Sequence, residues 1–248
     1  MSVADLAATP IERLFSAQRG VRVTDTDLHG QVRIDALVRY AQDIASDDIA
    51  DAGMTGAIPW IARKTTIEVR TPAHLREKLT ITTACDGVER MWARRRVDVA
   101  GSAGASATIH TVWVHVDLAS GRPAPIDADF ARVFTPVDPV PVSIRLTLPT
   151  SAPVDASRLG WSVRFSDLDV MAHANNSNAG QIIEQVLAVS GGRPASFRAD
   201  IDYRVPLAPD LDATVLWTQR DDGVDLWVFD DGDRSNLLLA ARVRTIGD

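Results

Sequence analysis

The chain carries an internal repeat, and this repeat restricts the possible folds more than any other feature of the sequence. Residues 22–28 have the sequence Arg-Val-Thr-Asp-Thr-Asp-Leu, and residues 164–170 have the sequence Arg-Phe-Ser-Asp-Leu-Asp-Val. Later in each half, residues 67–72 are Ile-Glu-Val-Arg-Thr-Pro and residues 201–206 are Ile-Asp-Tyr-Arg-Val-Pro. The same order of segments in both halves predicts a structural unit that occurs twice in one chain.

Each unit is predicted to contain a short strand, then one amphipathic helix, and then four strands. In the first half, apolar residues recur every three or four positions, which predicts a helix over 33–52 that ends at Gly53. The residues that set this period are Ile34, Leu37, Val38, Ala41, Ile44 and Ala45. Alternating polar and apolar residues predict strands near 58–71, 78–86, 90–100 and 105–118. Residues 1 to about 17 are expected to form a leader or a short helix.

A helix followed by an antiparallel meander buries its apolar stripe when the sheet wraps around it. The predicted fold class is therefore α+β: two such units in tandem, with their sheets paired edge to edge as in a dimer fused into one chain. Seven prolines from Pro123 to Pro153 favour an extended connection between the units. We expect the first unit over 15–137, a proline-rich linker over 138–157 and the second unit over 158–248.

The composition argues against several classes of protein. A net charge of −7 is unlike that of nucleic-acid-binding proteins, and Cys85 is the only cysteine, so neither a disulfide framework nor a cysteine-rich metal site is expected. The N-terminus lacks the basic start and apolar run of a signal peptide, and no stretch approaches the roughly 18 apolar residues of a membrane helix. We expect a soluble cytoplasmic protein without a metal or another cofactor.

The densest group of polar side chains lies in the second unit, between its first strand and its helix. Its members are Asp167, Asp169, His173, Asn175 and Asn176. Because asparagine and serine are favoured at helix N-termini, this group is predicted to lie at the positive end of a helix. Free backbone amides there can hold an anion or polarise a carbonyl group.

The corresponding positions of the first unit separate two interpretations of this group. His173, Asn175 and Asn176 correspond to Gln31, Arg33 and Ile34, so this part of the group occurs in one unit only and favours a working site. The two aspartates correspond to Asp25 and Asp27, so capping of a turn is an equally open role for them.

Glu184 is a further candidate, because it lies among apolar residues on the predicted helix of the second unit. Such surroundings raise the pKa of a carboxyl group and suit a general acid or base. A solvated helix face is the alternative. The first unit has the neutral Gln42 at the corresponding position.

A strand that ends in Ser-Asp-Leu-Asp, followed by His-x-Asn-Asn at a helix start, resembles the acyl-acyl carrier protein (acyl-ACP) thioesterases of plants and bacteria. These are tandem hotdog proteins, and the resemblance covers nearly the whole chain, including Pro59-Trp-Ile-Ala-Arg63 at the start of a strand. It implies hydrolysis of acyl-ACP or acyl-CoA thioesters in fatty acid biosynthesis, by a monomeric pseudo-dimer or a homodimer. The acyl chain would lie along the central helix.

The resemblance, which matches Asp169 and His173 to the family motif, and the chemistry of the neighbouring residues together suggest roles. Asp169, His173, Asn175 and Glu184 are the expected catalytic residues, and Asn176, Asp167 and Met171 are expected to bind substrate. Asp169 and His173 would activate water, with Glu184 as the alternative base, and amides near the two asparagines would stabilise the oxyanion. Three neighbouring arginines are the expected landing patch for the acidic carrier protein: Arg94, Arg95 and Arg96.

The sequence departs from the plant pattern in ways that leave a second function open. Met171 replaces the asparagine of the plant Asp-x-Asn-x-His motif, and Pro206 and Leu207 follow the Tyr-Arg strand where the plant enzymes have Glu-Cys. Ala179 replaces an expected tyrosine. A non-catalytic protein that binds acyl thioesters is therefore the alternative. A hotdog hydratase is a weaker option, since its Asp-x-Asn-Pro-x-His motif is missing.

Overall fold

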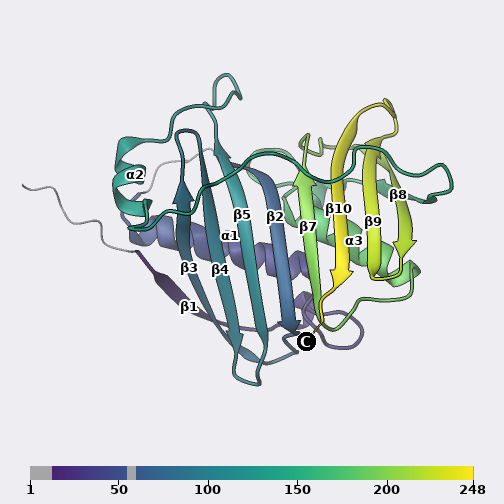
Figure 1. Cartoon of the computed structure of the whole chain (residues 1–248), viewed down its shortest axis with the longest axis horizontal. Coiled ribbons are helices and arrows are strands. Elements are labelled where there is room, and N and C mark those ends of the chain that lie inside the picture. The colour runs from purple at the N-terminus through teal and green to yellow at the C-terminus, as the bar shows by residue number, and fades with distance from the viewer. Residues whose placement is uncertain (1–12, 55–59, 248) are drawn as a thin grey trace, which may run out of the picture.

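The computed structural model describes residues 13–54 and 60–247, and the order of elements is the same in both halves (Figure 1). The first half consists of β1 (Phe15–Gly20), the short turn helix η1 (Val23–Asp25), α1 (Ile34–Asp51), β2 (Trp60–Thr71), β3 (Lys78–Val88), β4 (Trp92–Gly101) and β5 (Ser106–His115). The second half consists of β6 (Ser157–Ser162), η2 (Phe165–Asp167), α3 (Ser177–Val189), β7 (Phe197–Tyr203), β8 (Asp212–Arg220), β9 (Gly223–Asp230) and β10 (Leu237–Thr245). Between them lies α2 (Ala128–Phe134).

The described strands form one 10-stranded sheet in the order β1-β3-β4-β5-β2-β7-β10-β9-β8-β6. The second half of this order is the first half reversed, element for element, so the two units are related by an approximate two-fold rotation. They meet where β2 pairs with β7 in antiparallel register, with Ile67 opposite Ala199. The predicted edge-to-edge pairing of two sheets is confirmed.

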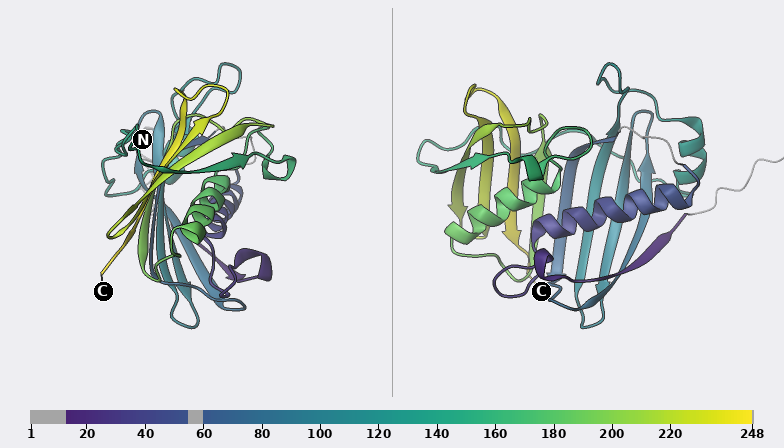
Figure 2. Two further views of the ribbon diagram at one scale, coloured as in Figure 1. Left: turned by 90° about the vertical axis from the view of Figure 1, so that its right-hand side faces the viewer. Right: turned by 180° about the vertical axis from the view of Figure 1, so that it is seen from behind.

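The helices α1 and α3 lie on the same face of the sheet, which curves around them (Figure 2). Every apolar residue that set the predicted period of the first helix is buried against the sheet. The two helices also contact each other, and Gly180 makes this possible: a Cβ atom there would lie 2.6 Å from the backbone nitrogen of Asp35. The N-terminal ends of the two helices are thereby brought close together.

Some predicted boundaries differ from the structure. The expected leader included residues that form the edge strand β1, in which Phe15 pairs with Thr83 of β3. Residues 1–12, and residues 58–59 of the strand predicted near 58–71, lie outside the described residues. The proline-rich stretch contains the helix α2, which begins where the Asp127 carboxylate accepts hydrogen bonds from the backbone amides of Asp129 and Phe130.

After α2 the chain crosses the face of the sheet opposite the helices (Figure 1). Indole N–H groups from both units hold it there: Trp92 donates to the carbonyl of Val142 over 3.0 Å, and Trp227 donates to that of Pro149 over 2.9 Å. The buried carboxylate of Asp202 accepts the amides of residues 147 and 148. The connection therefore fastens both halves of the sheet. Among the described helices, none has the length and apolar character needed to cross a membrane.

Candidate active site

The loops that precede α1 and α3 share one hydrogen-bonded scaffold. The carboxylate of Asp169 accepts the amide of Met171 over 2.9 Å, and Asp27 accepts that of His29 over 2.8 Å. In each loop the aspartate amide also donates to a carbonyl four residues later, that of His173 or of its counterpart. An aspartate that bonds to the backbone two residues ahead fixes a tight turn, so both residues have a structural role.

Asp167 stabilises the loop before α3 through hydrogen bonds of its side chain and its backbone. Its buried carboxylate accepts three hydrogen bonds from Arg164, while its backbone carbonyl accepts the amide of Asn175 over 2.8 Å. Burial alone raises the pKa of Asp167, but the bonds and charge of Arg164 outweigh burial and lower it below its ordinary value. Asp167, predicted to bind substrate, is thus occupied by Arg164 and does not line the cavity described below.

The backbone at Ala172 has a positive φ of 57°, in the left-handed region. The first unit has Gly30 at this position, with a φ of 74°. A residue with a side chain is destabilised in this conformation, whereas glycine adopts it freely. The second loop therefore holds a strained turn immediately before His173, and such strain gathers at functional sites.

The start of α3 presents a free donor. The side-chain oxygen of Asn175 accepts the amide of Ser177 over 3.0 Å, and its nitrogen donates to the Asp169 carboxylate over 3.3 Å. The backbone N–H of Asn176, which lies between these two residues, has no hydrogen-bond acceptor among the described residues. Since the N-terminus of a helix carries a partial positive charge, this N–H is suited to binding an oxyanion.

The corresponding amide of α1 is occupied. There the N–H of Ile34 donates to a carboxylate oxygen of Glu184 over 2.7 Å, and Glu184 forms an ion pair of 2.6 Å with Arg193. The Arg193 guanidinium also binds Asp27 and Gln31, which fills this end of α1. Burial raises the pKa of Glu184, although the charge of Arg193 opposes this shift. Glu184, predicted as a catalytic residue, is thus held at the other helix start.

Five of the predicted residues line one cavity of about 420 Å³. They are Asp169, Met171, His173, Asn175 and Asn176. The other walls come from both units: the start of β2, the loop after β5, and the residues that end and follow β7. His173 is exposed, and the Tyr203 hydroxyl donates to the carbonyl of Asn176 over 3.3 Å. The cavity combines a carboxylate, an imidazole and a free backbone donor.

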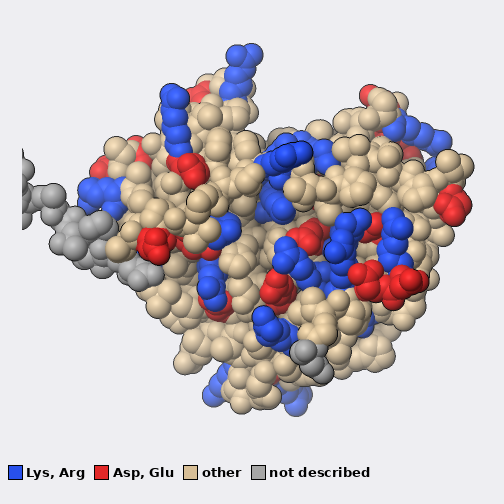
Figure 3. Space-filling view, in the orientation of Figure 1, with Lys and Arg blue, Asp and Glu red and all other residues tan. Residues whose placement is uncertain are grey.

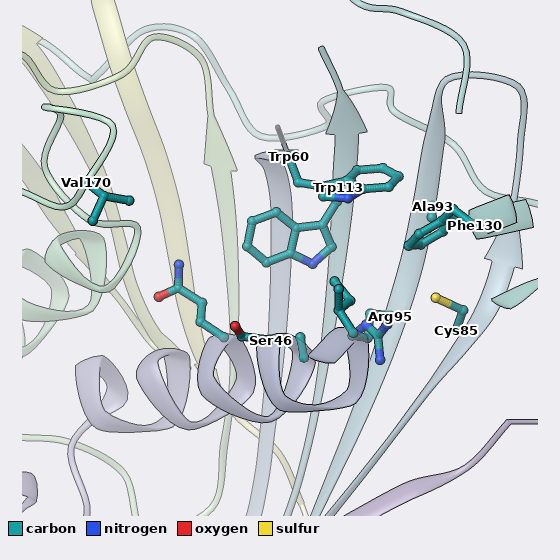
Figure 4. Close-up of a pocket in the computed structure, with 11 residues that line it drawn as sticks. Ser46, Trp60, Cys85, Ala93, Arg95, Trp113, Phe130 and Val170 are labelled. Carbon is teal, nitrogen blue, oxygen red and sulfur yellow. The ribbon is translucent and has the colours of Figure 1, made fainter. Parts of the chain in front are cut away.

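A second cavity, of about 430 Å³, extends from this loop into the first unit, between α1 and the sheet (Figure 4). Val170 borders it at one end, and Cys85 and Arg95 lie at the other, beyond Trp113. Trp60 lines both cavities, and Val170 lies between two residues of the first cavity, so the two spaces adjoin at this loop. The mainly apolar walls of the second cavity suit an acyl chain.

Two of the residues that form these spaces were not predicted from the sequence. Gln42 lines the second cavity, and it corresponds to Glu184 in the repeat. The repeat identifies Gln42 as the counterpart of Glu184, but the contact of Glu184 with the start of α1 is seen only in the structure. Trp60 carries no such internal indication, because its place depends on how the two units meet.

The three arginines expected to form a landing patch do not lie on one surface. Arg95 points into the first unit and is 4% exposed. Arg94 and Arg96 lie on the opposite face, paired with Asp86 and Asp98. Cations and anions also alternate over β7, β10 and β9 on this face (Figure 3). The predicted patch is therefore wrong, since its central member is buried and its neighbours are neutralised.

Comparisons with known proteins agree with this architecture. The family model of the acyl-ACP thioesterase N-terminal domain matches residues 12–134. The uncharacterized protein Rv2001 of Mycobacterium tuberculosis is 29% identical over 219 residues, which cover 87% of each chain. The 12:0-ACP thioesterase from Umbellularia californica matches with a TM-score of 0.79 and 17% identity, over 93% of this chain and 96% of that one. An acyl-ACP thioesterase from Bacteroides thetaiotaomicron has a TM-score of 0.75 and 16% identity, over 93% and 97%. The tandem hotdog fold expected from the sequence is confirmed.

Proposed function

We propose that this chain, a divergent member of the acyl-ACP thioesterase family, releases a free fatty acid from acyl-ACP or acyl-CoA at the start of α3. In this reaction water adds to the thioester carbonyl carbon, the carbon–sulfur bond breaks, and the thiolate leaves with a proton. The step would end chain elongation in cytoplasmic fatty acid biosynthesis.

The observation that carries the proposal is the difference between two equivalent amides. The N–H of Ile34 binds a carboxylate oxygen of Glu184 over 2.7 Å, which demonstrates that a helix start of this geometry holds an anionic oxygen. The N–H of Asn176 has the same place in α3 and no acceptor among the described residues. The oxyanion of the tetrahedral intermediate would take the position that the glutamate oxygen takes at α1.

Asp169 and His173 supply the proton transfers in this proposal. The Asp169 carboxylate, held by the Asn175 amide, deprotonates the attacking water. The exposed His173 imidazole protonates the departing thiolate. Asn176 and Met171 line the same cavity and would contact the substrate next to the thioester. Glu184 has no part in these transfers, because Arg193 and the start of α1 hold its carboxylate.

The two adjoining cavities divide the substrate between them. The space in the first unit, which ends away from the candidate loop, receives the acyl chain, and the space around His173 receives the pantetheine arm that both carriers share. The thioester would then lie at the junction, beside Asp169 and the start of α3. Either carrier is compatible with this arrangement, and the chain would act as a monomeric pseudo-dimer or as a homodimer.

A panel of acyl-ACP and acyl-CoA thioesters tests the proposal, with release of free thiol as the measurement. We expect turnover that falls at least about 100-fold in His173→Ala. Gln31→Ala, at the equivalent position of the first loop, is the matched control and should retain turnover. Equal rates for the wild-type chain and His173→Ala would overturn the assignment. Tight binding of intact thioester without thiol release would instead support a non-catalytic acyl-binding protein, for which Pro206 and Leu207 in the cavity wall would be the reason.

A further inference from the structure

We infer that the acyl group which this chain accepts carries an oxygen acceptor at its far end, and that Arg95 binds this oxygen. The inference rests on the proposed thioesterase function and adds the substrate class. A plain alkyl chain would meet a buried cation at the end of its cavity, whereas a hydroxyl, keto or carboxylate oxygen would meet a hydrogen-bond donor.

The position of Arg95 follows from the shape of the second cavity. Val170, from the loop of the candidate site, borders one end, and Arg95 and Cys85 border the other (Figure 4). An acyl chain whose thioester lies beside that loop therefore extends toward Arg95. Arg95 is the one charged residue among the described residues that line this cavity.

The guanidinium group of Arg95 is fixed on one side only. Its Nη1 atom bonds to the Asp48 carboxylate and lies 3.3 Å from the Thr83 hydroxyl. The group also lies over the ring of Phe134, 5.2 Å from the ring centre. The second terminal nitrogen, Nη2, is buried and has no hydrogen-bond partner among the described residues.

An unpaired donor of this kind requires an explanation, because native proteins seldom leave a buried N–H of a charged group unsatisfied. Asp48 cannot satisfy it in its present geometry, since one carboxylate oxygen binds Arg95 Nη1 and the other binds Arg13 Nε over 2.6 Å. Burial raises the pKa of the neighbouring Cys85, so its thiol remains neutral and offers no anion. Because Arg95 lines the second cavity, an oxygen of a ligand held there is the partner that the inference assigns to Nη2.

The chemistry of guanidinium determines which ligands fit. It donates hydrogen bonds, accepts none and remains charged, so it favours oxygen acceptors and disfavours a methyl terminus. A hydrogen bond to a charged group changes affinity by about tenfold or more. The chain should therefore prefer acyl groups with a distal oxygen over unsubstituted acyl groups of the same length by at least about tenfold in kcat/KM.

Matched pairs of acyl-CoA thioesters, over a series of chain lengths, test this preference. Each pair consists of a methyl-terminated chain and the same chain with a terminal hydroxyl or carboxylate group. The wild-type chain should favour the oxygenated member, Arg95→Met should lose the preference, and Arg95→Lys should keep part of it. Arg96→Met, which changes the adjacent outward-facing residue, is the control and should keep all of it. Equal or faster hydrolysis of the methyl-terminated chain by the wild type would overturn the inference, as would a preference that survives in Arg95→Met.

A binding experiment separates this inference from the proposed function. S-alkyl-CoA thioethers of the same matched pairs, which lack the thioester carbonyl and are not hydrolysed, are added to the wild-type chain and to Arg95→Lys, and the shift of the melting temperature is measured. If no thioester is hydrolysed but the oxygenated thioethers alone stabilise the wild type, the hydrolase proposal fails and the inference holds. If thioesters are hydrolysed but both thioethers of a pair stabilise the chain equally, the inference fails and the hydrolase proposal holds.

Discussion

The starts of α1 and α3 have the same backbone scaffold, and they differ in what faces it. At α1, the side chains of Glu184 and Arg193 cross from the second unit and occupy the Ile34 amide and the Asp27 carboxylate. At α3, Asn176 and Asp169 line a cavity with walls from both units. One start thus holds the two units together, and the other borders a cavity.

This difference shows that chemistry at a helix start depends on its neighbours more than on the helix itself. Both starts offer the same backbone donors and the same aspartate turn. A carboxylate from the other unit converts one of them into a structural contact, whereas the corresponding residue of the repeat, Gln42, is neutral and lines the second cavity. Exchanging these side chains between the two starts is therefore the direct way to test the comparison.

The largest effect should come from neutralising one aspartate of the pair. We expect Asp169→Asn to lower kcat by about 100- to 10,000-fold, because the turn survives with an asparagine oxygen while the general base is lost. Asp27→Asn should leave kcat within about twofold. Steady-state kinetics of thiol release measures both variants, and comparable losses in the two would show that the aspartates act through the turn alone.

A smaller effect is expected when Gln42 is given the chemistry of Glu184. In Gln42→Glu the new carboxylate would bind the Asn176 amide, as Glu184 binds the Ile34 amide, and would compete with the oxyanion. Relative to the wild type at the same pH, we expect kcat/KM to fall about tenfold at pH 7. This difference should shrink as the pH falls toward the ordinary glutamate pKa of about 4.3. A loss that does not change with pH would contradict occupation of the amide by a charge.

The strained turn should respond in opposite directions in the two loops. Ala172→Gly relieves a left-handed alanine and should raise the free energy of unfolding by about 1 kcal/mol. Gly30→Ala creates the same strain in the first loop and should lower it by a similar amount. Denaturant unfolding measures both changes. Two changes of the same sign would mean that the loops do not share this backbone.

The smallest expected effect is the pH dependence that Glu184 adds to stability. Its pKa is raised in the folded state above the ordinary glutamate value, so its contribution is fully present below that value and is lost as the pH rises through the folded pKa. Relative to Glu184→Gln, the wild type should therefore lose stability as the pH rises from about 4 toward neutrality. Unfolding curves over this range measure the difference, and a wild type that gains relative stability would contradict the raised pKa.

Several features of the fold follow from the sequence because they depend on local pattern. The apolar period predicted α1 to within a residue at each end, since that stripe packs on the sheet. The alternation of side chains along β4 also predicts that Arg95 points inward, because Ala93, Arg95 and Val97 occupy one face of the strand. Grouping three consecutive arginines as one surface patch overlooked this period.

Other features depend on contacts between distant segments, and no local pattern shows them. The edge strand β1 exists because it pairs with β3, and its own sequence has little strand character. Glu184 lies 150 positions from the amide that it binds, so its place depends on how α3 crosses α1. Five of the predicted site residues line one cavity because they are near neighbours in the chain.

The antiparallel pairing of β2 with β7 joins two units of one chain, and this allows mutations to change each unit separately. In a homodimer every substitution appears at both symmetric positions, so a change that improves one site damages or duplicates the other. A covalent pair removes this constraint: Asn176 can change without Ile34, and Gln42 without Glu184. The pairing is also intramolecular, so a cavity walled by both halves forms at any protein concentration. In a homodimer the same cavity would be lost when dilution separates the subunits.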